Sequence, residues 1–399
     1  MTVKIVFSEE ERWLLALLRN ALNNQELIEY TLEQGTVDWA QVVALAKKHA
    51  VLSLLYDITK DNVLFQGQGN YIKKESRQIV LQSYRLLFLT KYVVTKLTEQ
   101  GISVIVLKGV ATGSMYPVPE LRKSGDIDLL VPQETNKKML VHVMEQAGFW
   151  LSEEQHANHH VVFASPEGIS VEVHTMLAEP FAYKNINQAM EGHMKECWNY
   201  LQMQDVMGVE LPILDKPFHA YELLLHMLQH FVYAGFGLKL LCDWVAIWRQ
   251  CWTQQEKRLF IELVKESGLE KFAEALTVVC SKYLGLEKED FAWQITDESM
   301  ADEVLREILD AEDFGNADVN RMVMMSGTGI TAYVKEFHHQ MHLNFPKAGK
   351  CFWVWPVLWI VTLVRFLKNN RKVRNTSAGK VLKEAARRSQ LMNKLKLFQ

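Results

Sequence analysis

The sequence predicts an α+β fold, in which a small mixed β-sheet lies between an N-terminal and a C-terminal helical region. Three observations lead to this prediction. Apolar residues recur at helical spacing through the first hundred residues, short β-branched runs separated by glycines follow, and helical spacing then returns. Hydrophobic residues make up 49% of the 399 residues and charged residues 23%, which is typical of globular proteins and allows two or three domains. We divide the chain into residues 1–100, 101–180, 181–345 and 346–399.

The N-terminal region is predicted to be helical. Ser8 and Glu11 have the spacing of a capping box and precede an apolar pattern that starts at Trp13. Residues 37–58 predict one or two further helices. Residues 71–101 predict a long helix that ends at Gly101, because glycine is a common helix stop.

The central region alternates between strands and helices, and this is the predicted α/β core. The run ISVIVLKG is of strand length and ends at a glycine, and SPEG separates two alternating runs as a hairpin turn would. In chain order we expect a strand over 102–109, a short helix over 110–116, a loop, a strand over 126–132, a helix over 136–149, and hairpin strands over 160–164 and 169–175. From 181 to 345 we expect helices, most clearly after LPILDKPFHA at 211–220.

Two aspartates in the second predicted strand suggest a metal site. Asp126 and Asp128 are two residues apart, so they share one face of a strand while Ile127 and Leu129 share the other. Carboxylates so placed lie roughly 6–7 Å apart and repel each other unless a cation lies between them. Mg²⁺ is bound by one or two protein carboxylates together with phosphate oxygens and water. Glu172, which faces the same way as His174, supplies a third acid on a later strand.

In this arrangement the sequence resembles the nucleotidyltransferase superfamily that includes DNA polymerase beta. More narrowly, the chain resembles an uncharacterised bacterial nucleotidyltransferase family through the ordered motifs VLKG, MYP, an arginine and GDIDLLV. The later segments VEVH, LLLHMLQH and LLCDW are also similar to that family. The resemblance covers roughly residues 40–345. It implies a nucleotidyltransferase-type core in which Asp126, Asp128 and Glu172 bind Mg²⁺ or Mn²⁺ and act in catalysis. The implied reaction transfers a nucleoside monophosphate from a nucleoside triphosphate to an acceptor hydroxyl and releases pyrophosphate.

The position of the triphosphate-binding turn is open between two glycines. The superfamily has Gly-Ser about ten residues before its aspartates, which matches Gly113-Ser114, but that pair falls inside the predicted short helix. A turn at Lys108-Gly109, between a strand and a helix, would present backbone N–H groups to phosphate. We favour Gly109, where the usual serine is missing and Lys108 or Ser114 could take its role.

Arg122 lies just before the aspartates and suits bidentate phosphate contact, although it could instead be a surface residue that pairs with Glu120. Lys108 could likewise bind phosphate or simply lie at the rim of the sheet.

The histidines are less informative. His156, His159, His160 and His174 fit no common zinc spacing. His226 and His230 are four residues apart on an apolar helix, and we interpret them as core or groove residues. Asp243 could orient one of them or contact substrate.

The C-terminal region combines an apolar run with a basic tail. From Arg365 onwards there are eleven Lys or Arg and a single acid, Glu384, so the tail carries +10 and the remainder −13 of a net −3. Such a charge asymmetry suggests a basic arm that binds nucleic acid, anionic lipid or an acidic partner. The alternative is a basic helix that is simply exposed to solvent. The run at 351–364 is 14 residues long, too short to span a bilayer, and Pro356 interrupts it. We interpret it as a buried helix, with peripheral membrane contact through 351–374 as the alternative.

The five cysteines form no C-x-x-C pair, and acidic residues near the start interrupt the apolar run that a signal peptide would need. We therefore expect a cytoplasmic protein, with the inner face of the membrane as a further possibility. The acceptor is not readable: a small molecule, a sugar, a protein or RNA all fit. The rival to an enzyme is a non-catalytic nucleotide-binding or assembly module of the same fold.

Overall fold

The structure is a computed structural model of the whole chain. It describes residues 5–23, 37–60, 62–65, 67–152, 160–181, 184–233, 235–291, 293, 298–311, 338, 341, 345, 351–362, 364 and 387–397.

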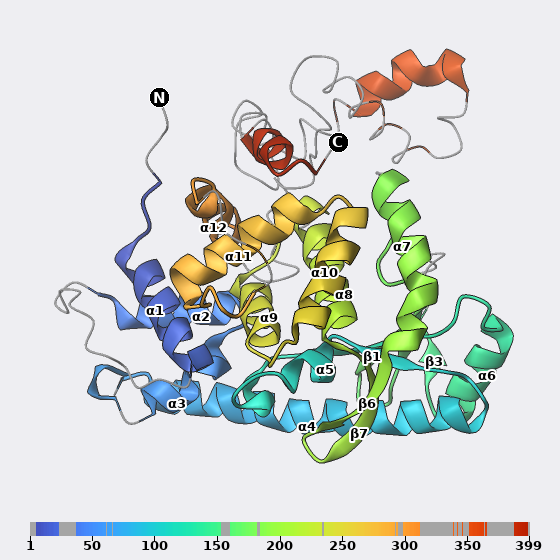
Figure 1. Cartoon of the computed structure of the whole chain (residues 1–399), viewed down its shortest axis with the longest axis horizontal. Coiled ribbons are helices and arrows are strands. Elements are labelled where there is room, and N and C mark those ends of the chain that lie inside the picture. Colours follow the sequence, from blue (N-terminus) through green and yellow to red (C-terminus); the bar gives the residue numbers. More distant parts are fainter. Residues whose placement is uncertain are drawn as a thin grey trace.

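The α+β prediction is confirmed: a seven-stranded mixed sheet has helices on both faces and at both ends of the chain (Figure 1). The strand order is β3-β4-β5-β2-β1-β7-β6. Strand β1 pairs antiparallel with β2 and parallel with β7, and β2 pairs parallel with β5. The strands are β1 (Ile105–Leu107), β2 (Asp126–Leu130), β3 (Trp150–Leu151), β4 (His160–Ala164), β5 (Ser170–His174), β6 (Leu201–Val206) and β7 (Val209–Leu214).

The predicted hairpin is present, with strands close to the predicted ranges. In β4 and β5, His160 pairs with His174 and Ala164 with Ser170. The turn between them contains Gly168 at φ +76°, a conformation that favours glycine. The parallel pairing of β5 with β2 then sets Asp128 directly opposite Glu172.

The hairpin of β6 and β7 was not predicted, because residues 201–214 were expected to belong to the helical region. Strand β6 is an edge strand of sequence LQMQDV, in which polar residues on the exposed side weaken the strand pattern. Its turn is Met207-Gly208, both at positive φ, rather than the Asn-Gly or Asp-Gly that signals such turns. The sheet therefore extends beyond the core that was expected to end at residue 180.

Alternate residues of the strands point into two separate cores. On one face, Ile127 and Leu129 pack with Leu86 and Leu87 of α4 (Gly69–Glu99) and with the apolar side of α6 (Lys137–Gln146). On the other face, Leu107 and Leu130 join a larger core formed with the helical regions. Helix α4 runs along one edge of the view in Figure 1, with the helical regions on the opposite side of the sheet.

The predicted N-terminal helices are confirmed. Helix α1 (Glu9–Asn23) begins with the expected capping box: the Ser8 hydroxyl accepts from the Glu11 N–H at 3.2 Å, and the Glu11 carboxylate accepts from the Ser8 N–H at 2.8 Å. Helix α4 ends at Glu99, two residues before Gly101, which has φ +74°. The two remaining helices of this region are α2 (Trp39–Lys48) and α3 (Tyr56–Thr59).

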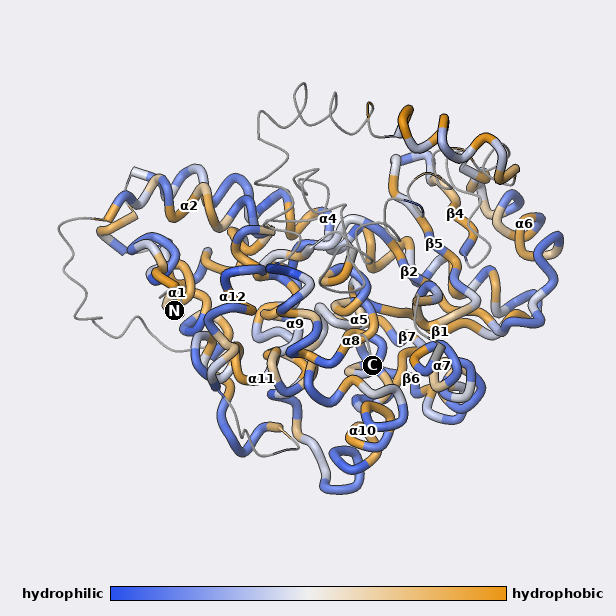
Figure 2. The backbone as a smooth tube through the Cα atoms, turned by 90° about the horizontal axis from the view of Figure 1, so that it is seen from above, coloured by the Kyte–Doolittle hydropathy of each residue, from blue (hydrophilic) through white to orange (hydrophobic). Residues whose placement is uncertain are grey.

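The described elements after β5 are helices, apart from the β6–β7 hairpin. In Figure 2 the central helices α8 and α9 show long hydrophobic stretches, whereas the outer helix α10 alternates between hydrophobic and hydrophilic residues. Helices that are surrounded by other elements, such as α8 and α9, are apolar on most sides, whereas a helix with one solvated face, such as α10, has apolar residues on one side only. The helices are α7 (Lys184–Glu196), α8 (Lys216–Tyr233), α9 (Leu238–Trp248), α10 (Gln254–Glu266), α11 (Glu270–Leu284) and α12 (Ala301–Leu309).

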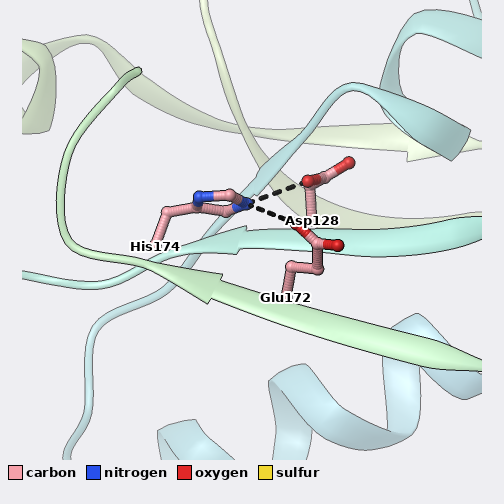
Figure 3. Close-up of side chains that lie close together, drawn as sticks. All are labelled: Asp128, Glu172 and His174. Carbon is pink, nitrogen blue, oxygen red and sulfur yellow. Dashed lines mark hydrogen bonds and ion pairs between the residues drawn. The ribbon is translucent and has the colours of Figure 1, made fainter. Parts of the chain in front are cut away.

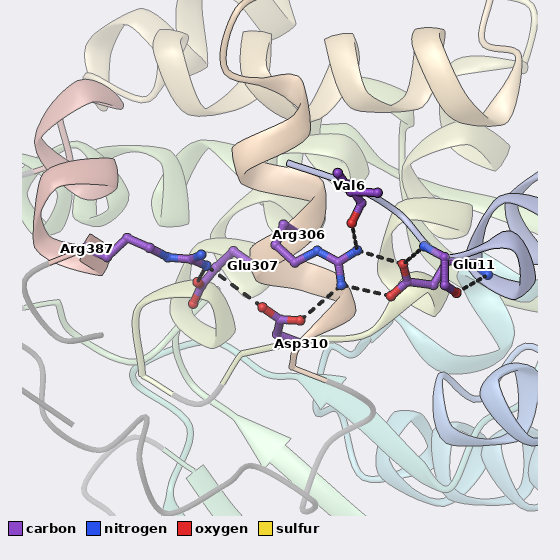
Figure 4. Close-up of polar contacts among 7 residues, drawn as sticks. Val6, Glu11, Arg306, Glu307, Asp310 and Arg387 are labelled. Carbon is purple, nitrogen blue, oxygen red and sulfur yellow. Dashed lines mark hydrogen bonds and ion pairs between the residues drawn. The ribbon is translucent and has the colours of Figure 1, made fainter. Parts of the chain in front are cut away.

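Helix α12 joins the two ends of the chain through ion pairs (Figure 4). The Arg306 guanidinium binds both carboxylate oxygens of Glu11, at 2.8 and 2.6 Å. Glu307 forms an ion pair with Arg388, whose Nε atom lies 2.7 Å from Glu307 Oε1; Arg388 is on a helix over 387–394. Arg388 also donates to the Phe231 carbonyl at 2.9 Å, so it caps the C-terminal end of α8.

The apolar run at 351–364 is not part of the core, so the buried-helix interpretation is wrong. Its helix over 355–362 lies at the periphery in Figure 1. Trp353 is 78% exposed, Ile360 64% and Val357 62%. Within the described residues no helix is both long and apolar enough to cross a membrane. Most of the basic tail, including residues 365–374, lies outside the described residues.

Candidate functional site

The turn between β1 and α5 (Gly109–Gly113) has an unusual backbone. Lys108 has φ +38° and Gly109 has φ +44°, so two successive residues adopt positive φ at the end of a buried strand. Such a conformation is unfavourable for lysine and persists only where the surrounding structure imposes it. The turn directs the Lys108 side chain towards β2, where its ammonium lies 3.5 Å from the Asp128 carboxylate.

A buried ion pair from a distant helix holds this turn. Arg122 donates to both carboxylate oxygens of Asp243 on α9, at 2.7 and 2.8 Å, and to the Gly109 carbonyl at 3.1 Å. The Tyr116 hydroxyl donates to the same carboxylate at 2.6 Å. Burial raises the pKa of Asp243, but the charge and hydrogen bonds of Arg122, with smaller contributions from Lys239 and Tyr116, together outweigh burial and lower the pKa. The carboxylate is therefore ionised and fixes Arg122 against the turn.

The second part of the site lies on β2 and β5. Asp128 and Glu172 are opposite each other on the two parallel strands, and His174 follows Glu172 on the same face. The His174 Nε2 atom lies 2.9 Å from Asp128 Oδ1 and 3.7 Å from Glu172 Oε2. Figure 3 shows the imidazole directed towards both carboxylates. Asp126 is the exposed first residue of β2, on the same face as Asp128.

Charge repulsion and burial act together on these acids. Burial and the negative charge of Asp128 raise the pKa of Asp126, and the same two causes raise the pKa of Glu172. Burial also raises the pKa of Asp128, but Lys108 and the hydrogen bond with His174 outweigh it and lower the pKa overall. The three carboxylates thus repel one another, and an added cation would relieve this repulsion.

The helical region contributes a buried acid. Glu222 of α8 is fully buried, and the Lys108 ammonium lies 3.8 Å from its carboxylate. Among the described residues, neither of its carboxylate oxygens has a hydrogen-bond partner. Burial raises the pKa of Glu222 to about 7, although Lys108 opposes this. The site therefore continues from the sheet into α8, and Lys108 lies between the two parts.

The same helix carries two buried histidines. The rings of His226 and His230 lie 4.5 Å apart in an edge-on arrangement. Burial lowers the pKa of His230 to about 4, helped by the positive charges of Lys108 and Lys239. Burial also lowers the pKa of His226, so both rings are neutral near pH 7.

The structure brings together most of the residues that the sequence singled out. Lys108, Gly109, Asp126, Asp128 and Glu172 lie around one position on the sheet. Of the other predicted residues, Ser114 directly follows α5 and donates to the Ala111 carbonyl at 2.7 Å. Arg122 is buried against Asp243 rather than paired with Glu120. Glu120 instead accepts a hydrogen bond from Tyr84.

Sequence reasoning missed three contributors. His174 has a signal in the sequence, because it is two residues after Glu172 and so shares its face. Glu222 and Lys239 have none: they are single charged residues on apolar helices, and only the packing of α8 and α9 on the sheet brings them near the site. His156 and His159 lie outside the described residues.

The donor set fits a divalent metal ion. Oxygen atoms of Asp128 and Glu172 and the Nε2 atom of His174 all lie within 4.8 Å of one another, which is close enough to share one ion. Two acids and one imidazole supply negative charge and lone pairs towards one point, and Asp126 adds a further negative charge on the same face of β2.

Comparison with known proteins gives a family and one distant structure. The model of a family described as uncharacterised nucleotidyltransferase matches residues 35–285. A solved structure titled as an antigenic nucleotidyltransferase-like protein from Paracoccidioides brasiliensis is similar at 15% identity and a TM-score of 0.30, and the match covers 51% of this chain and 93% of that one. No curated protein matches the sequence.

Proposed function

Because the chain belongs to the uncharacterised nucleotidyltransferase family, we propose that it transfers a nucleoside monophosphate from a nucleoside triphosphate to an acceptor hydroxyl and releases pyrophosphate. The observation that carries the proposal is the cross-strand pair of Asp128 and Glu172, with Lys108 held 3.5 Å from Asp128 by the strained turn. Three acids that repel one another, beside the Lys108 ammonium, suit a metal-bound polyphosphate.

In this proposal Asp126, Asp128 and Glu172 hold Mg²⁺ or Mn²⁺. The bound ion would neutralise charge that develops on the phosphate oxygens and polarise the attacking hydroxyl. Lys108 and the backbone of the Lys108-Gly109 turn contact the triphosphate, with Lys239 as a second nearby cation. Glu172, whose pKa is raised by burial and by Asp128, suits acceptance of the proton that the acceptor hydroxyl loses.

Arg122 and Ser114 have supporting roles in the proposal. The Arg122 guanidinium is occupied by Asp243 and by the Gly109 carbonyl, which supports a positioning role for Arg122 rather than direct phosphate contact. The Ser114 hydroxyl is occupied by the Ala111 carbonyl, which favours Gly109 over Gly113-Ser114 as the phosphate turn.

The test compares Asp128→Asn with Glu145→Gln, an exposed acid on α6 that serves as the control. Binding of a non-hydrolysable triphosphate would be measured by calorimetry with Mg²⁺ or Mn²⁺, and pyrophosphate release over a panel of triphosphates and acceptors. Loss of the central ligand is expected to weaken metal-dependent triphosphate binding by more than about 100-fold. Mutation of a residue that only hydrogen-bonds to a metal ligand already lowers metal affinity by about 10- to 100-fold. Undiminished binding and turnover in Asp128→Asn would contradict the proposal.

A non-catalytic nucleotide-binding or assembly module is the second candidate. It is favoured by the residue after Gly109, which is valine where the superfamily pattern has serine. Metal-dependent triphosphate binding without pyrophosphate release from any triphosphate would support this candidate over the enzyme.

We further propose that the protein is cytoplasmic and attaches to the inner face of a membrane through residues 351–374. All five cysteines are free. The exposed Trp353, Val357 and Ile360 precede five cations at Arg365, Lys368, Arg371, Lys372 and Arg374, a combination that suits an anionic bilayer surface. Co-sedimentation with anionic but not with zwitterionic vesicles is expected, and equal recovery in the supernatant with both would contradict the attachment.

A further inference from the structure

The third member of the ligand group is an imidazole, and this bears on which metal the site takes. We propose that His174 binds the metal directly through Nε2, together with Asp128 and Glu172, and that the site therefore prefers Mn²⁺ and the later first-row ions to Mg²⁺. The inference rests on the proposed function only in that both place a divalent ion at these residues.

The position of Nε2 supports direct binding. It lies 2.9 Å from Asp128 Oδ1 and 3.7 Å from Glu172 Oε2, so it faces the space that the two carboxylates share (Figure 3). The side chain of His174 is 15% exposed, between Asp128 at 8% and Glu172 at 30%, so the imidazole lies within the group and not at its outer edge. A histidine that served only the fold would not need to face two acids from neighbouring strands.

A neighbouring ring restricts the imidazole. His160 pairs with His174 across β4 and β5, and the two ring centroids lie 5.5 Å apart at 42°. His160 in turn lies 3.7 Å from the Glu179 carboxylate. Metal-binding histidines are commonly supported by such outer groups, which limit the orientations of the ring.

Nitrogen donors discriminate between metals. Mg²⁺ prefers hard oxygen ligands and retains water, whereas imidazole suits the transition metals, for which affinity rises from Mn²⁺ to a maximum at Cu²⁺ and falls at Zn²⁺. To bind the ion, His174 must direct the lone pair of Nε2 at it. Any hydrogen on Nε2 must then leave that atom, and the hydrogen bond between His174 and Asp128 is given up.

The main experiment needs no nucleotide. The full-length protein, grown with ¹⁵N-labelled histidine, would be loaded with Mn²⁺ alone and studied by electron spin-echo spectroscopy. A ¹⁵N coupling to Mn²⁺ is expected in the wild type and in His142→Gln, an exposed control on α6, and its absence from His174→Gln is expected. Bound Mn²⁺ without any ¹⁵N coupling would overturn the inference, because His174 would then only position Asp128, while the proposed function would stand.

Affinities provide a second measurement. The wild type is expected to bind Mn²⁺ at least about tenfold more tightly than Mg²⁺, and His174→Gln is expected to remove most of this difference mainly by weakening Mn²⁺ binding. Equal Mn²⁺ and Mg²⁺ affinities in the wild type would overturn the inference alone. If neither ion binds to the wild type, with or without a triphosphate, the proposed function fails together with the inference.

Discussion

Strand β2 presents Ile127 and Leu129 to one face of the sheet and Asp126 and Asp128 to the other. Leu129 is fully buried against an apolar core that includes Leu86 and Leu87 of α4. The preceding residue, Asp128, points to the opposite face and lies among Lys108, His174 and Glu172. The alternation of a β-strand thus lets one five-residue segment anchor the fold on one face and carry ionisable groups on the other. The comparison suggests that stability and chemistry can be changed separately here.

The largest effect is expected from Asp243→Asn, which tests whether the polar face contributes to stability as well as to chemistry. The change removes the charge that compensates Arg122, which is almost fully buried. Leaving one buried charge without its partner costs about 3–5 kcal/mol, so the free energy of unfolding should fall by that amount in urea titrations.

The matched control is the double variant Arg122→Met with Asp243→Leu. It removes both charges, so it should recover most of the lost stability. It should not recover triphosphate binding, because no guanidinium then contacts the Gly109 carbonyl. Equal destabilisation in the single and double variants would show that the pair acts through packing and would weaken the role given to its charges.

Leu129→Ala is the counterpart on the apolar face. Truncation of a buried leucine leaves a cavity and costs about 3 kcal/mol of the free energy of unfolding. Because Leu129 points away from the carboxylates, the metal affinity of the folded protein should stay within about twofold of the wild type. Calorimetry at a temperature where the variant remains folded would measure this. A large loss of metal affinity would break the separation between the two faces.

The sequence predicts this separation because it depends on period-2 alternation alone, and the same rule places Glu172 and His174 together. Helix stops at Gly101 and Gly148 and the hairpin turn at Gly168 were also predictable, since each requires a backbone that glycine favours. The ion pair of Arg122 with Asp243 was not, because the two residues are 121 positions apart and meet only through tertiary packing. The edge strand β6 escaped prediction because its polar residues face solvent.

The smallest effect is expected at the turn where β1 meets the polar face, and it distinguishes the two candidate phosphate turns. Gly109 has φ +44°, so Gly109→Ala costs about 1 kcal/mol through backbone strain; its new Cβ would lie 3.4 Å from the Ser124 hydroxyl, an ordinary contact. Gly113 is within α5, and a Cβ there would come no closer than 3.7 Å to the Pro119 carbonyl, so Gly113→Ala should be tolerated. Triphosphate affinity should fall by about tenfold or more in Gly109→Ala, because the turn that contacts the phosphates is strained; a factor of ten corresponds to about 1.4 kcal/mol of binding free energy. The affinity should be unchanged in Gly113→Ala and Ser114→Ala. The reverse pattern would move the phosphate turn to Gly113-Ser114 and leave Lys108 with a structural role beside Asp128.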